Sequence, residues 1–358
     1  MASAFGGNVR IVGATDLGGD WAPVRRLSLD NGSTVVVKTR REESGPWGGE
    51  AAVLDNERRG FELVSGLGID VAPRLLAADE ELGIVVMTDV GTGPSVQDLL
   101  FGENAADATA GLVALARTTG VLHGASAGIE HQWQERATFL DRTFEFWPEL
   151  RDAAADLDFP APAGVSADLE ALESDLADPR FRVFVHGDLG PNNAVLASGR
   201  ARLVDFEGSG FRHFALDAAS LRLPFPAYGY WAVLPAGVIA AMDEAYRAEL
   251  SRGWPDALND EVYQAGIATG CAAWAIIRAH RLPLIASSGQ QPELALRRRT
   301  QIVQTLTSFA EIAVRAKRFE ALAHWFLALA EEMRERWDEA RQPPRVFRPF
   351  AGPLALES

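Results

Sequence analysis

The sequence of 358 residues contains a single cysteine, so no disulfide bond can form within the chain. A chain that does not depend on disulfides suits a reducing compartment, and we expect a cytoplasmic protein. The one cysteine, Cys271, lies in the apolar segment Gly270 to Trp274. This setting predicts a buried and unreactive thiol.

Long apolar runs are also missing. The longest, around Trp231 to Met242, contains Pro235 and is shorter than the ~20 residues that a helix needs to cross a bilayer. The first ten residues show no charged start followed by an apolar core, so we expect no signal peptide. These absences predict a protein without membrane contact.

Positive charge is scarce. Lysine and arginine number 34 against 49 aspartates and glutamates, which gives a formal net charge of −15. Such an excess opposes nonspecific binding to nucleic acid or to anionic membranes, and it is compatible with a cationic small-molecule partner. We therefore expect no nucleic-acid partner. No sequence feature assigns an oligomeric state.

One short stretch, His186-Gly187-Asp188-Leu189-Gly190-Pro191-Asn192-Asn193, places an acid and an amide at the spacing of a phosphoryl-transfer site. In phosphoryl-transfer enzymes a catalytic loop runs His-x-Asp-x-x-x-x-Asn, in which the aspartate accepts the proton of the substrate hydroxyl and the asparagine holds Mg2+. Asp188 and Asn193 occupy those two positions. His186 would brace the loop.

A second metal-binding aspartate should follow after a short hairpin. Asp205 does so, behind the apolar pair Leu203-Val204 and a turn at residues 197–200. Carboxylate and amide oxygens are hard ligands that suit Mg2+, so we assign Asn193 and Asp205 to the metal. Taken alone, an Asp or Asn in such a loop is usually a turn former, and a histidine such as His186 is more often a core residue. Their order and spacing together favour the catalytic interpretation.

The octet HGDLGPNN with Asp205-Phe206-Glu207 downstream resembles the aminoglycoside phosphotransferase and choline kinase group, which are small-molecule kinases with a protein-kinase fold. Gly190 stands where serine/threonine kinases usually carry lysine, and Glu207 replaces the last glycine of Asp-Phe-Gly. Asp217-Ala218-Ala219 is similar to the Asp-Leu-Ala element of the group, whose aspartate braces the catalytic loop. Asp217 would therefore be structural.

This resemblance implies an α+β, bilobal protein-kinase-like fold with a small β-rich N-lobe and a larger, mostly helical C-lobe. We expect the N-lobe at residues 1–89, a hinge at 90–94 and the C-lobe at 95–358. Three N-lobe strands are predicted at residues 9–12, 22–29 and 33–38, the last two joined by the hairpin signal Asn31-Gly32. Lys38 ends the third strand, where the resemblance places an ATP-binding lysine.

The resemblance also implies other contacts with the nucleotide. Gly18 and Gly19 could let backbone amides approach the phosphates, although a plain glycine turn explains them equally well. The lysine needs an acidic partner on the next helix, expected over residues 56–64. We choose Glu57; Glu50 competes with it, and a surface charge is the alternative for Glu57.

A further apolar strand, predicted at residues 84–87, would lead into the hinge, where backbone groups around Met87 and Asp89 would hold adenine. Met87 suits an ordinary core position equally well. Either ATP or GTP fits this scheme.

Beyond the hinge the pattern is mostly helical. Helices are expected at residues 95–100, 112–123, 236–250, 261–278 and 294–337, with a loop at 160–164. His123 is expected to be a packing residue, and the Arg297-Arg298-Arg299 run a solvated helix face. Aromatic side chains that could stack an acceptor, or equally belong to the core, are Tyr228, Tyr230 and Trp231.

Together these features predict an ATP- and Mg2+-dependent phosphotransferase that acts on a hydroxyl of a small polar molecule, with Asp188 as the base. Cationic acceptors such as aminoglycosides are compatible with the acidic composition. A pseudokinase that binds nucleotide without turnover is the alternative, opposed by the presence of Lys38, Asp188, Asn193 and Asp205. An unusual protein kinase is disfavoured by Gly190, by Glu207 and by the lack of Ala-Pro-Glu after Asp205.

Overall fold

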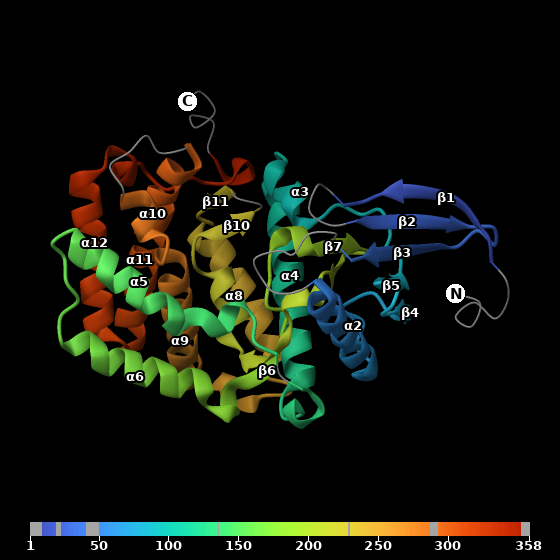
Figure 1. Ribbon diagram of the computed structural model, residues 1–358, viewed down its shortest axis with the longest axis horizontal. Coiled ribbons are helices and arrows are strands. Elements are labelled where there is room, and N and C mark those ends of the chain that lie inside the picture. The colour runs from blue at the N-terminus through green and yellow to red at the C-terminus, as the bar shows by residue number, and fades with distance from the viewer. Residues whose placement is uncertain are drawn as a thin grey trace.

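The structure, a computed structural model, describes residues 9–18, 23–40, 50–134, 136–227, 230–286 and 293–351. Within these ranges, a small antiparallel sheet and the helix α2 lie beside a larger body of helices (Figure 1). The α+β, bilobal, protein-kinase-like prediction is therefore confirmed.

The sheet of the small lobe has the strand order β1-β2-β3-β5-β4, with every neighbouring pair antiparallel. Its strands are β1 (Ile11–Asp16), β2 (Val24–Leu29), β3 (Thr34–Thr39), β4 (Leu75–Asp79) and β5 (Ile84–Thr88). The predicted hairpin is present, because Gly32 adopts φ +80° in the turn between β2 and β3. The first strand begins two residues later than Val9, where the prediction placed it.

The two-residue alternation of β3 decides which way Lys38 points. Val35 belongs to a small apolar cluster on one face of the sheet. Lys38 lies opposite Val85 in the ladder, and Val85 joins the main core on the other face. Lys38 therefore faces the same side of the sheet as this core.

Helix α2 (Glu50–Gly66) belongs to the small lobe and continues beyond both ends of the predicted segment. It packs on residues 206–208, where the rings of Phe61 and Phe206 meet edge to face at 5.2 Å. Gly60 permits this approach, because a Cβ at that position would lie 2.9 Å from Cβ of Phe206. The helix is thus held against the segment that follows Asp205.

The large lobe is built around α4 and α9. Helix α4 packs along α8, and α9 contacts α5, α6, α7 and α11. Its helices are α3 (Val96–Phe101), α4 (Ala105–Ser126), α5 (Thr143–Asp156), α6 (Gly164–Ala177), α7 (Ala215–Ala218), α8 (Ala236–Leu250), α9 (Asp260–Ala279), α10 (Leu282–Ala286), α11 (Glu293–Ala316) and α12 (Glu320–Arg336). Among the described residues, no helix combines the length and apolar character that crossing a bilayer requires.

One helix prediction is wrong. Residues 294–337 form two helices, α11 and α12, which pack against each other. The break falls where Lys317 and Phe319 adopt φ of +52° and +54°. A left-handed backbone cannot continue a right-handed helix, so the chain reverses there. The expected loop at 160–164 is present and ends as α6 begins at Gly164.

In the described part of the large lobe there are also three two-stranded ladders: β6 (Arg182–Val185) with β9 (Gly210–His213), β7 (Ala194–Ala197) with β8 (Arg200–Leu203), and β10 (Phe225–Ala227) with β11 (Tyr230–Ala232). The predicted β7–β8 turn is tight, because Ser198 and Gly199 both adopt positive φ. A hydrogen bond of 3.0 Å from the Val204 amide to the Asn193 carbonyl extends this ladder. The predicted catalytic loop and the Asp205 segment therefore lie side by side.

Candidate active site

The loop that follows β6 is held from the side of Asp205. Nε2 of His186 lies 2.9 Å from the Val204 carbonyl, so this nitrogen carries the proton and donates. Gly187 adopts φ +84° where the loop crosses Gly208. These contacts agree with the bracing role predicted for His186.

Asp217 on α7 binds the backbone of the same loop. Its carboxylate accepts hydrogen bonds from the backbone amides of His186, at 2.6 Å, and Gly187, at 3.1 Å. Nε2 of His123 lies 3.2 Å from the same carboxylate, and Nδ1 of His123 lies 2.8 Å from the Tyr246 hydroxyl. Although burial alone would raise the pKa of Asp217, the hydrogen bond and charge of His123 lower it. The structural role predicted for Asp217 is confirmed, and His123 supports it.

The predicted base, Asp188, is joined to Asn193. Nδ2 of Asn193 donates to the Asp188 carbonyl, at 2.9 Å, and to its carboxylate, at 3.1 Å. Burial raises the pKa of Asp188, and the negative charge of Asp205 raises it further against the opposing effect of His186. The side chain is thus a stronger base than a solvated aspartate.

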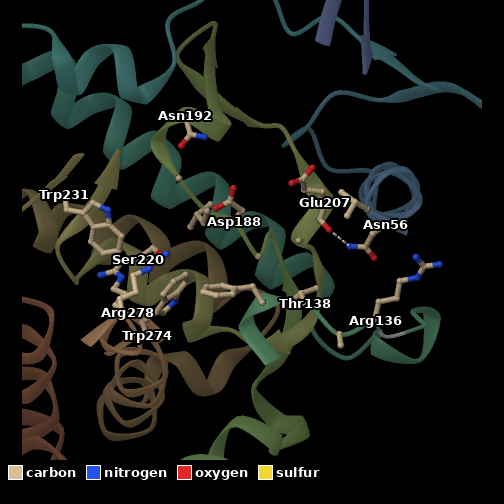
Figure 2. Close-up of a pocket in the computed structure, with 18 residues that line it drawn as sticks. Asn56, Arg136, Thr138, Asp188, Asn192, Glu207, Ser220, Trp231, Trp274 and Arg278 are labelled. Atoms are coloured by element: carbon tan, nitrogen blue, oxygen red, sulfur yellow. Dashed lines mark hydrogen bonds between the residues drawn. The ribbon is translucent and has the colours of Figure 1, made fainter. Parts of the chain in front are cut away.

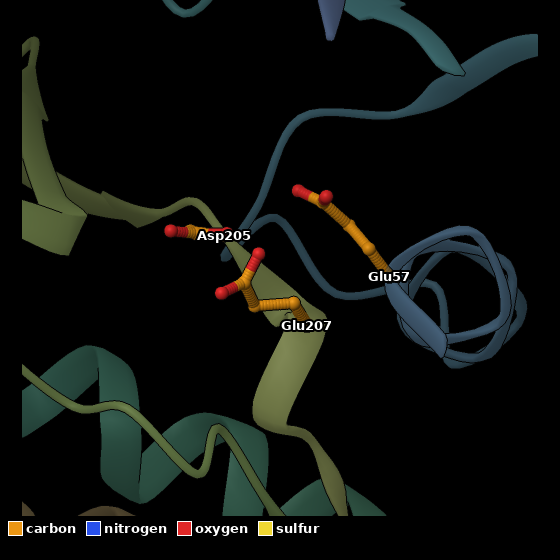
Figure 3. A group of neighbouring side chains, drawn as sticks. All are labelled: Glu57, Asp205 and Glu207. Atoms are coloured by element: carbon orange, nitrogen blue, oxygen red, sulfur yellow. The ribbon is translucent and has the colours of Figure 1, made fainter. Parts of the chain in front are cut away.

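Lys38 gathers three carboxylates from separate parts of the chain. Its Nζ lies 2.7 Å from Glu57 on α2, 2.5 Å from Asp205 and 3.2 Å from Glu207. Figure 3 shows the three carboxylates converging from α2 and from the segment after β8. Asp205 presents its side chain from a left-handed backbone with φ of 70°. The predicted ion pair of Lys38 with Glu57 is present, whereas the side chain of Glu50 lies outside the described residues.

One ammonium faces three acids, and the pKa shifts follow from this imbalance. Burial alone lowers the pKa of Lys38, but attraction to the three carboxylates outweighs it, so the pKa is raised. Burial raises the pKa of Glu57 to about 7, against the attraction of Lys38. For Asp205, Lys38 overcomes the effect of burial and lowers the pKa.

This cluster has the chemistry of a divalent-cation site. One oxygen from each of Glu57, Asp205 and Glu207 lies within 4.8 Å of the others. Hard oxygen ligands with net negative charge suit Mg2+. The residues around the predicted metal ligand Asp205 therefore fit the ion. Asn193 precedes β7, and its side-chain oxygen accepts a hydrogen bond of 2.8 Å from Nδ2 of Asn192.

Other residues predicted to bind nucleotide are already engaged. The Gly18 amide donates to the Val24 carbonyl at 3.1 Å and to the Asp16 carboxylate at 3.2 Å, and Gly19 lies outside the described residues. Met87 is buried in the main core. Asp89 accepts two hydrogen bonds from Arg26, at 2.6 and 3.0 Å. Their contact with nucleotide stays a prediction.

A cavity of about 420 Å³ extends from this cluster past Asp188 into the large lobe (Figure 2). We call it the acceptor cavity. Its size is typical of small-molecule sites. Toward the small lobe the cavity is lined by Asn56 and Glu207. On the other side of Asp188 its lining includes Phe139, Ser220, Trp231, Trp274, Arg278 and Arg281. Figure 2 shows Asp188 between Glu207 and the group formed by Ser220, Trp231 and Arg278.

Of the aromatic residues proposed from sequence, Trp231 lines this cavity. Tyr230 packs against Phe101 and Phe347 instead, and Tyr228 lies outside the described residues. The sequence analysis missed Trp274, Arg278 and Arg281. An arginine in the last turn of the Ala- and Ile-rich helix α9, four residues after a tryptophan, was the available signal.

The expectation for the 297–299 arginine run is wrong at Arg299. This side chain is buried and donates to the Ile285 carbonyl at 2.9 Å and to the Glu339 carboxylate at 3.1 Å. It lies on the core side of α11, whereas Arg297 is exposed. Cys271 is buried as expected, and burial raises the pKa of its thiol to about 12.

One solved structure shares the fold, and two others show weaker similarity. A microcompartment-associated aminopropanol kinase is 15% identical, with a TM-score of 0.52 over 86% of this chain and 94% of that one. A choline kinase from Streptococcus pneumoniae is 16% identical, with a TM-score of 0.45 over 83% and 93% of the two chains. A macrolide 2'-phosphotransferase from Brachybacterium faecium is 17% identical, with a TM-score of 0.45 over 82% and 96%.

No curated protein sequence matches the chain. The model of the phosphotransferase enzyme family, APH, matches residues 13–259, which is more than half of the chain and includes Lys38, the His186 to Asn193 loop and Asp217. The resemblance drawn from the HGDLGPNN octet is therefore confirmed. The chain belongs to the phosphotransferase enzyme family and is a small-molecule kinase with a protein-kinase-like fold.

Proposed function

We propose that the protein uses ATP and Mg2+ to phosphorylate a hydroxyl group of a small polar molecule. The observation that carries the proposal is that Asp188 lines one cavity between Glu207, which is bonded to Lys38, and an aromatic-lined space at Trp231 and Trp274. A phosphate donor fits the first side and an acceptor fits the second. GTP in place of ATP is an alternative donor.

Each residue of the site then has a distinct role. Asp188 takes the proton from the acceptor hydroxyl while that oxygen bonds to the γ-phosphorus and the bond to the ADP oxygen breaks. Its raised pKa favours this transfer. Asn193 keeps the Asp188 carboxylate in place through the 3.1 Å hydrogen bond, and Lys38 binds the donor phosphates. Mg2+, held by Asp205 and Asn193, would supply neutralisation of phosphate charge.

The donor would lie between the lobes. We propose residues 1–89 as the N-lobe, 90–94 as the hinge and 95–358 as the C-lobe, with adenine held by backbone groups around Met87 and Asp89. Two hydrogen bonds from Arg26 to Asp89, and a third of 2.6 Å to the Gly91 carbonyl, support a fixed start of this hinge. Gly93 allows the hinge backbone to pass close to β7, because a Cβ at this position would lie 1.7 Å from the Leu196 carbonyl oxygen.

The test measures ADP release by the purified protein with ATP and Mg2+. The acceptor panel covers aminoglycosides, macrolides, amino alcohols, sugars and hydroxy acids, and GTP replaces ATP in a parallel series. Asp188→Asn should lower acceptor-dependent turnover by roughly a hundredfold or more while nucleotide still binds. Asp205→Ala should abolish Mg2+-dependent nucleotide binding.

The matched control is Asp156→Asn, an exposed aspartate at the end of α5. It removes the same charge and should leave turnover unchanged. Unchanged turnover in Asp188→Asn would remove Asp188 as the base. Nucleotide binding without turnover on any acceptor would indicate a regulatory protein that does not transfer phosphate.

We also place the enzyme in the cytoplasm, because its one cysteine is buried and takes no part in a disulfide. Fractionation of cells that produce the protein, followed by detection with an antibody, tests this location. Recovery with the membrane or secreted fraction would contradict it.

A further inference from the structure

The far end of the acceptor cavity is formed around a buried arginine to which the described residues supply no acidic partner. Arg278 on α9 is 4% exposed. Its guanidinium carbon lies 3.9 Å from the ring centre of Trp231 and 5.2 Å from that of Trp274. Nη1 donates to the Pro224 carbonyl at 3.2 Å. Nε is buried and has no hydrogen-bond partner among the described residues.

A second arginine adds to the positive charge at this end. Arg281 is half-buried and lines the same cavity, and its guanidinium makes no hydrogen bond or ion pair with another described residue. Burial lowers its pKa, and the positive charge of Arg298 lowers it further. Burial lowers the pKa of Arg278 to about 9, and the charge of Arg281 contributes to the decrease. Two guanidinium groups therefore lie in one cavity.

Arg222, in the same lobe, differs from Arg278 because it has an acidic partner. Its guanidinium pairs with the Asp243 carboxylate, and Nη2 donates to the Tyr263 hydroxyl at 2.7 Å. The described carboxylates that line the acceptor cavity are Asp188 and Glu207, which bond to Asn193 and Lys38. In Figure 2 Glu207 lies on the far side of Asp188 from Arg278. No described acid of the cavity wall neutralises the two arginines.

An unpaired buried charge is costly unless a partner arrives from outside. Guanidinium groups present a planar set of donors that matches carboxylate and phosphate oxygens. Indole rings beside them offer flat apolar surface. The far end of the cavity thus has a local charge opposite to the net charge of −15 carried by the chain.

We propose that the acceptor is anionic: a carboxylate or phosphate group binds Arg278 and Arg281, a flat apolar body lies against Trp231 and Trp274, and the hydroxyl reaches Asp188. This inference rests on the proposed function, since it takes the cavity as the acceptor site. It departs from the expectation of a cationic acceptor. Net charge acts over the whole surface, whereas the groups within contact distance decide which ligand the cavity holds.

The test compares four ligands with one shared body, all derived from benzyl alcohol with a para substituent. The substituent is a carboxylate, a phosphate ester, a neutral carboxamide or a cationic aminomethyl group. Isothermal titration calorimetry measures their binding to the protein with and without nucleotide. At least one of the two acids should bind about tenfold or more tightly than the amide, because charged hydrogen bonds replace neutral ones. The tighter of the two acids identifies the anionic group.

Two variants locate the effect. Arg281→Gln and Arg278→Gln should each reduce the preference for acid over amide by about tenfold. Arg252→Gln is the matched control: it removes the same charge from an exposed arginine that pairs with Glu249 outside this cavity, and should leave the preference unchanged. If Arg278→Gln does not fold, Arg281→Gln alone decides. The inference is overturned if the amine binds as tightly as the acids or more tightly, or if neither acid binds. It is also overturned if Arg281→Gln leaves the preference for acid over amide unchanged.

ADP release, measured on the same ligands, separates this inference from the proposed function. Acids that bind in an arginine-dependent way without supporting ADP release would leave the anion site standing and refute phosphate transfer to them. ADP release with amines and not with acids would support the kinase and overturn the anion site.

Discussion

Gly187 is the position at which a single methyl group should disturb the active site most. Its φ of +84° lies in the left-handed region, where a side chain costs about 1–2 kcal/mol. A Cβ built at this position would lie 1.9 Å from the Gly208 carbonyl oxygen. Gly187→Ala must therefore move the loop or the 206–208 segment, which costs roughly 1–3 kcal/mol more by analogy with overpacked cores.

The matched control is Gly199→Ala in the β7–β8 turn. Gly199 has φ of +74°, but no atom lies within 4 Å of the Cβ position. This variant carries the backbone cost without the clash. Gly187→Ala should be less stable than Gly199→Ala by about 1–3 kcal/mol in guanidinium chloride unfolding.

Turnover should separate the two glycine variants further. The Gly187 amide bonds to Asp217, and the next residue is Asp188, so any shift of the loop displaces the proposed base. A misplacement of about 1 Å lowers turnover by roughly a hundredfold. Gly199→Ala should retain turnover on the same acceptor. Equal stability and equal turnover in the two variants would refute the argument from the Gly187–Gly208 crossing.

Three further predictions concern buried ionisable groups. Asp217→Asn should lower stability by about 1–3 kcal/mol and reduce turnover, because an amide cannot accept from both loop amides as the carboxylate does; denaturant unfolding and ADP release check this, and wild-type values would contradict it. The pKa of the Glu57 carboxyl is raised from 4.5 to about 7, so its contribution to folding stability is present below about pH 4.5 and is lost as the pH rises through 7. The free energy of unfolding of wild type, relative to Glu57→Gln, should therefore fall by up to about 3 kcal/mol from pH 4.5 to 8. A rise over this range would contradict the sign of the shift. Cys271, whose thiol pKa is raised to about 12 by burial, should react with a thiol reagent at pH 8 only after unfolding, and rapid labelling of the native protein would show that the site is open.

The predictions that succeeded from sequence rest on short-range constraints. A His-x-Asp-x-x-x-x-Asn loop and a following hairpin fall within about twenty residues, so their spacing already restricts where the side chains lie. The Asn31-Gly32 turn and the helices of the large lobe follow from local backbone preferences and apolar period. The prediction of one helix over residues 294–337 failed for the same reason. The apolar period continues across the break, and the left-handed residues there are Lys317 and Phe319, so no glycine marks the end of the first helix.

Contacts between distant segments were only partly accessible. Lys38 meets Asp205 across 167 residues and Glu207 across 169. The resemblance to known kinases suggested the pairing with Glu57, whereas the approach of Glu207 was not expected. Three acids around one lysine produce a net negative charge, and only their common location makes that charge a site for a cation.

The sequence by itself determined the family, the kind of reaction and the loop that carries Asp188, because these depend on residue types at fixed short spacings. The tertiary structure alone decided what surrounds that loop. In the sequence, Arg278 is a single charge in an apolar helix. In the structure its guanidinium carbon lies 3.9 Å from the ring centre of Trp231, which is more than forty residues earlier in the chain. The charge and shape of an acceptor cavity depend on which distant side chains are buried together, and burial is set by packing of the whole chain and not by any one segment.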